Sequence, residues 1–198
     1  ELLSADRARK DEDFGTLARE YSDAPEGANG GQFGMRSADR LPEVFVTAHE
    51  AMMHLARLKA GDSVLIHAAA GGVGSAAVQL AYATGATVYA TTEGSKLARV
   101  EHLGADVAID YKTQDFADVI ADKTQGRGVD VIIDMDFATA SQWVTGGGLK
   151  PHGQLIGYGS NVVGDIPLSF RPLLFNSIGL KFFLVYDLLP ADRTWCVN

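Results

Sequence analysis

One glycine-rich stretch of the sequence, residues 68–74, has the residue types and the spacing to hold a phosphate group. Gly71 and Gly74 are spaced like the last two glycines of the pattern G-x-G-x-x-G, and Ala68 takes the place of the first glycine. Such a site needs a tight turn, a backbone that approaches the ligand without a Cβ atom in the way, and N–H groups at the start of a helix. The residues predicted to supply these features are Ala70, Gly71, Gly72, Val73 and Gly74.

The surroundings of this glycine loop, Ala68–Gly74, favour a dinucleotide over a turn that binds no ligand. The loop follows the apolar run Val64-Leu65-Ile66 and opens a helical pattern. A strand, a glycine loop and a helix in this order form the first unit of a dinucleotide-binding sheet, in which the pyrophosphate lies at the helix N-terminus.

The tip of the second strand indicates which dinucleotide binds. NAD sites usually place an acidic side chain there, on the ribose diol. We place the tip at Thr91, which is neutral, while Ser95 and Lys96 offer a hydroxyl and a cation to a 2′-phosphate. This pattern favours NADP(H), although Lys96 also fits a solvated position in the first turn of a helix. If the tip lies two residues later, Glu93 supports NAD instead.

Further candidate residues follow other strands at the same edge of the expected sheet, where ligands bind in folds of this kind. Tyr111 follows the third strand and is placed to pack against adenosine or ribose. Gly157, Tyr158 and Gly159 end the fifth strand, where the nicotinamide is expected, and glycines there allow the backbone to approach a flat ring. Ordinary packing and a simple turn are the alternatives. We interpret His67 as a polar residue satisfied beside the loop.

The sequence does not indicate a catalytic side chain. It contains no serine nucleophile in a G-x-S-x-G turn, its 5 histidines are scattered, and its 1 cysteine, Cys196, excludes a disulfide framework and a cysteine-rich zinc site. We therefore predict no metal. Hydride transfer needs no protein nucleophile, because the cofactor supplies the reacting carbon and the protein supplies orientation.

The elements that must position these residues alternate between strands and helices. The expected strands are Ser63–His67, Thr87–Thr91, Val107–Asp110, Val129–Asp134, Gly153–Tyr158 and Leu180–Val185. The expected helices are residues 43–58, Val73–Ala83, Ser95–His102, Gln114–Lys123 and Ala138–Thr145. Alternation of this kind predicts an α/β fold with a doubly wound parallel, Rossmann-like sheet, and the continuous apolar strands indicate helices on both faces.

Composition narrows the partners. With 17 basic and 25 acidic residues the net charge is −8, and no run of Lys or Arg appears, so we expect no nucleic-acid partner. The longest apolar runs are too short to span a bilayer and no signal peptide opens the sequence, so we expect a cytoplasmic protein without a membrane partner.

The first 45 residues differ from the rest and predict a short, irregular segment. Phe14, Leu17 and Tyr21 recur at helical spacing, which predicts a helix over Asp13–Tyr21, and a run rich in glycine follows it. We place the boundary of the nucleotide-binding domain at residues 45–46.

Residues 46–197 resemble the medium-chain dehydrogenase/reductase superfamily, and most of all its zinc-independent NADPH:quinone oxidoreductase, or zeta-crystallin-like, branch. The resemblance rests on several motifs: Thr47-Ala48-His49-Glu50-Ala51, residues 58–74, His102-Leu103-Gly104-Ala105-Asp106, Asp110-Tyr111, residues 126–130 and Tyr186-Asp187-Leu188. It implies NADPH-dependent reduction of a quinone or a conjugated enone. Family positions near the cofactor match Thr47, Ala70–Val73, Lys96, Tyr111 and Gly157–Gly159.

The sequence departs from this family at two places. Where the family shows a Gly-Gly pair after the fourth strand, this chain has Asp134-Met135-Asp136-Phe137, and a carboxylate at Asp136 is expected to crowd or repel the cofactor. The family also carries a GroES-like substrate domain of about a hundred residues before the nucleotide domain, and we expect most of it to be missing here.

Residues 13–46 resemble the middle of a parvulin-type prolyl isomerase. They carry the patterns D-F-x-x-L-A-x-x-Y-S, N-G-G-x-x-G and L-P-x-x-F in order. The flanking strands and their histidines are not present in this piece, so we expect no isomerase activity from it.

Three hypotheses follow. The first is an NADPH-dependent oxidoreductase of the quinone reductase type, the second a catalytically incomplete NADP-binding module, and the third a prolyl isomerase fragment. The last expected strand leaves a sheet edge that must be covered or paired, and relatives commonly pair such strands, so we also expect a homodimer.

Overall fold

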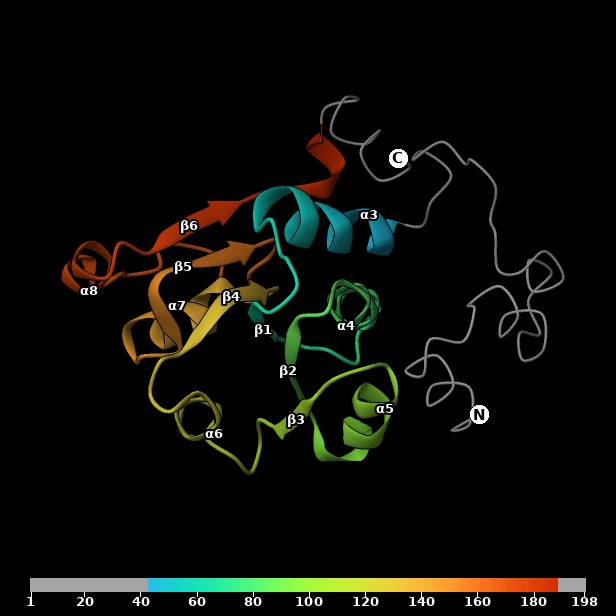
Figure 1. The fold of residues 1–198 in the computed structure, drawn as a ribbon. Coiled ribbons are helices and arrows are strands. Elements are labelled where there is room, and N and C mark those ends of the chain that lie inside the picture. The colour runs from blue at the N-terminus through green and yellow to red at the C-terminus, as the bar shows by residue number, and fades with distance from the viewer. Residues whose placement is uncertain (1–42, 189–198) are drawn as a thin grey trace, which may run out of the picture. The chain divides into compact units, whose positions relative to one another are not determined.

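The computed structural model describes residues 43–188, which build a six-stranded sheet (Figure 1). The strands lie in the order β3-β2-β1-β4-β5-β6, and every neighbouring pair is parallel. Their bounds are β1 Ser63–Ile66, β2 Thr87–Thr92, β3 Val107–Asp110, β4 Val129–Asp134, β5 Leu149–Gly157 and β6 Gly179–Phe182. This is the strand order of a doubly wound nucleotide-binding sheet, so the predicted fold class is confirmed.

Helices connect the strands and cover both faces of the sheet (Figure 1). They are α3 Glu43–His49, α4 Gly72–Thr84, α5 Leu97–His102, α6 Phe116–Thr124, α7 Phe137–Thr145 and α8 Phe170–Phe175, with the shorter or irregular helices η3 Glu50–Leu55, η4 Gly94–Lys96 and η5 Val185–Asp187. Each crossover joins two parallel strands, as the alternation in the sequence requires.

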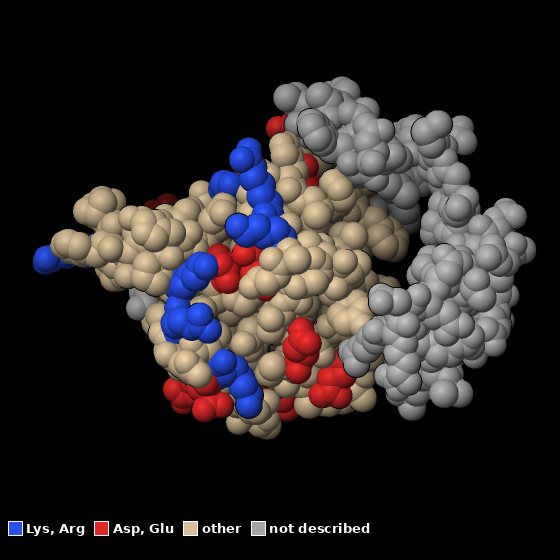
Figure 2. All heavy atoms as spheres, viewed as in Figure 1, with Lys and Arg blue, Asp and Glu red and all other residues tan. Residues whose placement is uncertain are grey.

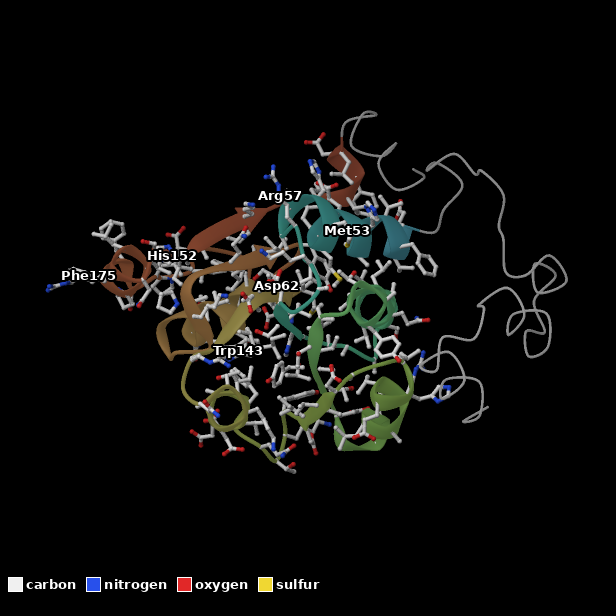
Figure 3. The ribbon with its side chains drawn as sticks, in the orientation of Figure 1. Met53, Arg57, Asp62, Trp143, His152 and Phe175 are labelled. Carbon is white, nitrogen blue, oxygen red and sulfur yellow. The ribbon has the colours of Figure 1, made fainter. Side chains whose placement is uncertain are left out.

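Two buried clusters lie on opposite faces of the sheet because successive strand residues point to opposite sides. Val64 and Ile66 of β1 pack with α3, η3, α4 and Val100 of α5, whereas Leu65 packs with Ile120 of α6 and with α7. Within the second cluster Trp143 of α7 lies 4.0 Å from Phe116 between ring centroids, and it is labelled in Figure 3.

The first described helix belongs to the nucleotide-binding unit from its first turn. A Cβ atom on Gly72 would lie only 3.0 Å from Cγ1 of Val44, so α3 packs closely on the start of α4. The predicted boundary at residues 45–46 therefore falls within α3. The expected helix over residues 43–58 is present but changes at Glu50 into a π-helix, a local irregularity often found at functional sites.

The larger differences from the expected elements lie near the C-terminal part of the sheet, where β6 ends at Phe182 rather than Val185 and Val185 begins η5. β5 begins at Leu149 rather than Gly153, with a register shift against β4 between Val129 and Val131. α8 was not expected, because its six residues include a proline and carry too short a pattern to read. The helix expected over Asp13–Tyr21 lies outside the described residues.

Surface properties of the described part agree with a folded domain that has one exposed apolar end. On the face seen in Figure 2, basic and acidic side chains are interspersed. Phe170, Leu174 and Phe175 of α8 are exposed, and Phe175 lies at the outer end of the molecule in Figure 3. Within residues 43–188 no helix has the length and apolar character needed to cross a membrane.

Candidate functional site

The glycine loop turns sharply between β1 and α4. Ala68 adopts a left-handed conformation with φ of 50°, and its carbonyl oxygen accepts a hydrogen bond of 2.9 Å from the N–H of Gly71. The N–H of Ala69 donates to the carbonyl oxygen of Thr91 at 3.0 Å, which ties the loop to β2. Ala68 thus adopts, at some cost in strain, a conformation that the first glycine of the usual pattern takes freely.

The N–H groups that open α4 point away from any partner in the described part of the chain. Gly71 caps the helix without a side-chain hydrogen bond, and the N–H groups of Gly72, Val73 and Gly74 donate to no atom of residues 43–188. Free N–H groups at the start of a helix, together with the positive end of its dipole, form an anion-binding site. The residues present therefore fit the pyrophosphate of a dinucleotide.

Gly74 is required by the packing of the loop on its own helix. A Cβ atom there would lie 2.7 Å from Cα of Ala69 and would also overlap the carbonyl oxygen of Ala68. At Gly71 the same test gives 3.1 Å to that oxygen, which is tight but less severe. The third glycine of the pattern thus keeps strand and helix close together.

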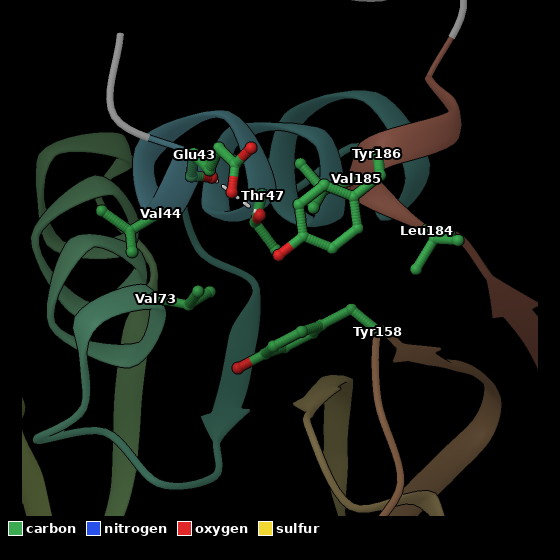
Figure 4. Close-up of a pocket in the computed structure, with 8 residues that line it drawn as sticks. All are labelled: Glu43, Val44, Thr47, Val73, Tyr158, Leu184, Val185 and Tyr186. Carbon is green, nitrogen blue, oxygen red and sulfur yellow. Dashed lines mark hydrogen bonds between the residues drawn. The ribbon is translucent and has the colours of Figure 1, made fainter.

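Two pockets lie on either side of the loop. The β2-side pocket has a volume of about 260 Å³ and is lined by Ala68, Ala70, Gly71, Thr92, Glu93, Lys96 and Tyr111. The α3-side pocket has a volume of about 220 Å³ and is lined by Glu43, Val44, Thr47, Val73, Tyr158, Leu184, Val185 and Tyr186 (Figure 4). The free N–H groups lie between a residue of one lining, Gly71, and a residue of the other, Val73.

The tip of β2 lies later than the sequence predicted. β2 continues to Thr92, which pairs with Asp110 of β3, and Thr91 is completely buried. The hydroxyl of Thr91 lies 2.7 Å from Nδ1 of His67, so this side chain offers no surface to a ligand. β2 therefore ends one residue later than predicted, Thr91 is buried, and Glu93 lines the pocket.

Glu93 lies between two lysines. Its carboxylate is 2.8 Å from Nζ of Lys96 and 3.0 Å from Nζ of Lys112. Hydrogen bonds from Lys96 and then Lys112 lower the pKa of Glu93 to about 2, so it is ionised throughout the physiological range. The same hydrogen bond, from Lys112 to Glu93, raises the pKa of Lys112. Ser95 donates its hydroxyl to Glu93 at 3.3 Å and does not line the pocket.

The α3-side pocket is apolar with hydroxyl groups at its wall (Figure 4). Thr47 is buried, and its hydroxyl donates to the carbonyl oxygen of Glu43 at 2.7 Å. Tyr158 enters from the end of β5, and among the described residues nothing lies within hydrogen-bond distance of its hydroxyl. Burial raises the pKa of Tyr158, as does the charge of Asp134, so the phenol stays protonated and is a donor.

The two glycines beside Tyr158 serve packing rather than the pocket wall. A Cβ atom on Gly157 would lie 2.9 Å from Cδ1 of Phe182 on β6, and one on Gly159 would lie 2.7 Å from the carbonyl oxygen of Met135. Both glycines keep neighbouring strands and loops close together, and neither belongs to the lining of these two pockets.

Asp136, expected to crowd the cofactor, is held by its own loop. Its carboxylate accepts hydrogen bonds from Oγ1 of Thr139 at 2.7 Å and from the N–H of Asn161 at 3.1 Å. These bonds lower the pKa of Asp136, that from Thr139 most. The side chain ties the start of α7 to the segment after β5 and belongs to neither pocket lining.

Asp134, in contrast, is fully buried at the end of β4 and incompletely paired. Its Oδ2 accepts from the N–H of Asp136 at 2.9 Å, while no atom in the described part of the chain pairs with Oδ1. Burial raises the pKa of Asp134 to about 7. The backbone N–H of Tyr158 donates to the backbone carbonyl oxygen of Asp134 at 3.0 Å, so the end of β4 lies beside the residue that enters the α3-side pocket.

Several residues that line the α3-side pocket were not predicted from the sequence. Glu43 and Val44 lie in a segment assigned to a different fold, and Leu184 and Val185 come from beyond β6. Only the topology brings these segments together around Val73. Tyr186 carried a signal, because it belongs to a motif of the resembling family, but nothing in the spacing placed it beside α3.

Comparison with known proteins identifies the family. The family described as "Zinc-binding dehydrogenase" matches residues 72–195, which is more than half of the chain, and the chain belongs to it. Among residues 43–188 no three His, Cys, Asp or Glu side chains come together to hold a metal ion, so we assign no step to zinc.

Solved structures of related proteins share the fold. A structure described as an enoyl reductase domain of a polyketide synthase is 32% identical with a TM-score of 0.60, and the match covers 71% of this chain and 77% of that one. CurK enoyl reductase is 31% identical with a TM-score of 0.69, over 83% of this chain and 50% of that one. The quinone oxidoreductase of Pseudomonas syringae pv. Tomato DC3000 is 26% identical with a TM-score of 0.68, over 76% and 47%.

Curated relatives are far longer than this chain. Erythronolide synthase EryA2 of Saccharopolyspora erythraea is 48% identical over 99 residues, which is 48% of this chain and 3% of that protein. The chain thus spans a small fraction of such relatives. Residues 3–62 match the family described as "PPIC-type PPIASE domain", and the described part of that match, residues 43–62, folds as α3, η3 and the connection into β1.

Proposed function

We propose that this chain is the nucleotide-binding part of an NADPH-dependent reductase that acts on a double bond conjugated to a carbonyl group. The observation that carries the proposal is the row of free N–H groups at Gly72, Val73 and Gly74 between two pockets. An extended dinucleotide with its pyrophosphate on these groups has a pocket for each of its halves.

In this proposal the β2-side pocket receives the adenosine half. Tyr111 is 48% exposed and presents its ring to a purine or ribose. Lys96 brings an ammonium group to a 2′-phosphate, with which it forms a charge-assisted hydrogen bond. Ala68, Ala70 and Gly71 form the floor and have no long side chain that would fill the space.

The α3-side pocket receives the nicotinamide and the substrate. The bound cofactor supplies a hydride from its ring. Val73 offers an apolar surface to the flat ring, and α3 closes the pocket from above (Figure 4). The hydroxyl of Tyr158 remains protonated and donates to a carbonyl oxygen in the pocket, either of the nicotinamide amide or of the substrate.

The relatives support a conjugated carbonyl compound as substrate. Enoyl reductases and a quinone oxidoreductase are among the similar solved structures. An enoyl thioester, an enone and a quinone share a carbon–carbon double bond next to a carbonyl. Because the enoyl reductases are the more similar in sequence, we favour an enoyl group over a quinone.

A second candidate function is cofactor binding without turnover. The match covers about half of two of the solved relatives, 50% of CurK and 47% of the quinone oxidoreductase. Tyr186, at the open side of the α3-side pocket, is 69% exposed, so the described residues leave one wall of this pocket open to solvent. In this case the pocket binds nicotinamide but does not hold the substrate in position for hydride transfer.

Calorimetric titration of the chain with NADPH, followed by an assay of NADPH oxidation, separates these functions. We expect NADPH to bind with a micromolar Kd, and the first function predicts oxidation that depends on an enoyl thioester or a quinone. Binding without oxidation supports the second function. No heat of binding at millimolar NADPH would contradict both.

We also propose that two copies pair through β6. This strand forms the edge of the sheet, and its residue Phe182 is exposed, as are Leu174 and Phe175 of the preceding helix. An apolar sheet edge is normally covered or paired. Sedimentation velocity over a hundredfold range of concentration is expected to show a dimer, and a monomer at every concentration would contradict pairing.

A further inference from the structure

The β2-side pocket contains a negative charge where a phosphate is proposed to bind. Glu93 follows the last residue of β2, lines the pocket and accepts hydrogen bonds from two lysines, Lys96 at 2.8 Å and Lys112 at 3.0 Å. Lys112 comes from the turn after β3, so the three charges are gathered from two strand ends. Together they carry one net positive charge.

The side-chain carboxylate of Asp110 fixes the two turns that carry Glu93 and Lys112. The carboxylate of Asp110 accepts hydrogen bonds from the N–H of Lys112 and from Oγ1 of Thr113, each at 3.0 Å. A Cβ atom on Gly94 would lie 2.8 Å from Oδ2 of Asp110, so the turn after Glu93 packs directly on this carboxylate. Lys112 is therefore positioned beside Glu93 before any ligand arrives.

The chemistry of the carboxylate is opposite for the two dinucleotides. An ionised carboxylate only accepts hydrogen bonds, so Glu93 can accept from the 2′- and 3′-hydroxyl groups of an unphosphorylated ribose. A 2′-phosphate carries a charge of about −1.5 to −2 and is repelled by the same group. To bind it, Lys96 and Lys112 must exchange Glu93 for the phosphate.

We infer that Glu93 is the residue that determines cofactor preference, and that it keeps NADH close in affinity to NADPH by occupying the two lysines that a 2′-phosphate needs. The inference rests on the proposed dinucleotide site and adds two residues, Glu93 and Lys112, to its specificity. It predicts that the pocket strongly selects the phosphorylated cofactor only after the carboxylate charge is removed.

The test is Glu93→Gln, which keeps the shape of the side chain and removes its charge. Calorimetric Kd values for NADPH and NADH are measured on the full chain. We expect the ratio of NADPH to NADH affinity to rise about 10-fold to 100-fold, the range for a hydrogen bond to a charged group. Glu101→Gln is the matched control, because it removes the same charge from an exposed position on α5 and should leave the ratio unchanged.

A second variant, Lys112→Ala, should weaken NADPH binding and leave NADH within about threefold, the effect of less than one neutral hydrogen bond. If both cofactors bind the unmodified chain and Glu93→Gln leaves their ratio unchanged, the inference is overturned while the proposed function stands. If neither cofactor binds the unmodified chain, the proposed function fails as well.

Discussion

The two pockets beside the glycine loop are built in different ways. The β2-side pocket is formed by three successive strand ends and the loop itself, and it contains the charged groups of Glu93 and Lys96 with Lys112 adjoining. The α3-side pocket draws on segments from Glu43 to Tyr186, and apolar and hydroxyl groups line most of it, with the acidic residue Glu43 at its edge. The first pocket therefore depends on three neighbouring strands over residues 68–111, while the second needs segments from both ends of the described chain. The following predictions test this difference.

The largest effect is expected from Gly74→Ala, which disturbs the start of α4 between the two pockets. The new Cβ would lie 2.7 Å from Cα of Ala69, so the loop backbone must move. We expect the free energy of unfolding to fall by about 1–3 kcal/mol and both NADPH and NADH binding to be lost. Urea unfolding and calorimetry measure the two effects. Ser75→Ala, the next residue, keeps its Cβ and loses one long hydrogen bond, from Oγ to the carbonyl oxygen of Ala69 at 3.3 Å, so it should cost less; equal losses in both variants would contradict the packing role.

The buried carboxyl group of Asp134 at the end of β4 predicts a pH dependence of stability. Burial raises the pKa of Asp134 to about 7, from about 3.9 in an unfolded chain. Between these values the unfolded chain releases the proton and the folded protein keeps it, so the unfolding free energy falls as pH rises from about 4 to 7, by about 2–4 kcal/mol. Above pH 7 this contribution is constant.

Asp134→Asn should remove that contribution, so the stability of the variant relative to the unmodified chain should improve from pH 4 to about pH 7 and then stay constant. Chemical unfolding at several pH values measures it. Asp118→Asn, at an exposed position of α6, is the control. Parallel curves for Asp134→Asn and the unmodified chain would show that Asp134 is not held protonated.

Removing Lys96 should affect only ligands that carry the 2′-phosphate. We expect Lys96→Ala to weaken NADPH and 2′,5′-ADP by about 10-fold to 100-fold and to spare NADH, because one hydrogen bond between charged groups is lost. Lys123→Ala changes the same charge on α6 and should alter neither Kd. An equal loss for NADPH and NADH would remove Lys96 from the phosphate site.

The opposite selectivity is expected at the other pocket. Tyr158→Phe deletes a hydroxyl that has no partner among the described residues, so stability should be unchanged. NADPH binding should weaken by about 3-fold to 10-fold, the value of one hydrogen bond, whereas 2′,5′-ADP, which lacks nicotinamide, should bind as before. If both ligands weaken together, Tyr158 does not act at the nicotinamide half.

The smallest effect concerns the loop that joins the pockets. Ala68 has a φ of 50°, where glycine has no steric cost, so Ala68→Gly should stabilise the fold by about 0.5–1 kcal/mol. Thermal unfolding should show a small rise in Tm. Ala70→Gly, in the same loop but without a left-handed conformation, should lower it; a lower Tm in both would mean that Ala68 is not strained.

The sequence predicted the parts of the fold and site that depend on local pattern. Two strands, Val107–Asp110 and Val129–Asp134, have the expected bounds, and Ala70, Gly71, Lys96 and Tyr111 lie around one pocket as expected. The end of β2 was misplaced because pairing of Thr92 with Asp110 extends the strand, and an isolated sequence does not contain that register. Because of that shift of one residue, Glu93 lines the pocket, and the pocket contains a negative charge that the predicted tip at Thr91 did not include.

Contacts between residues far apart in the sequence could not be predicted, for a similar reason. Gly157 and Gly159 were predicted to let a ligand approach the backbone. Their neighbours in the structure are Phe182 and Met135, which only the folded sheet brings close. The carboxylate of Asp136 read as an obstacle until its partners Thr139 and Asn161 were placed. In each case the residue type suggested a role, but the sequence did not show which residue packs against it.

The central claim is that a dinucleotide binds across the start of α4, with its pyrophosphate on the N–H groups of Gly72, Val73 and Gly74. Amide chemical shifts recorded during an NADPH titration test it most directly. We predict that these three resonances move most and that smaller shifts follow at Lys96, Tyr111 and Tyr158 on either side. Saturating NADPH binding that leaves the three loop amides unmoved would contradict the account.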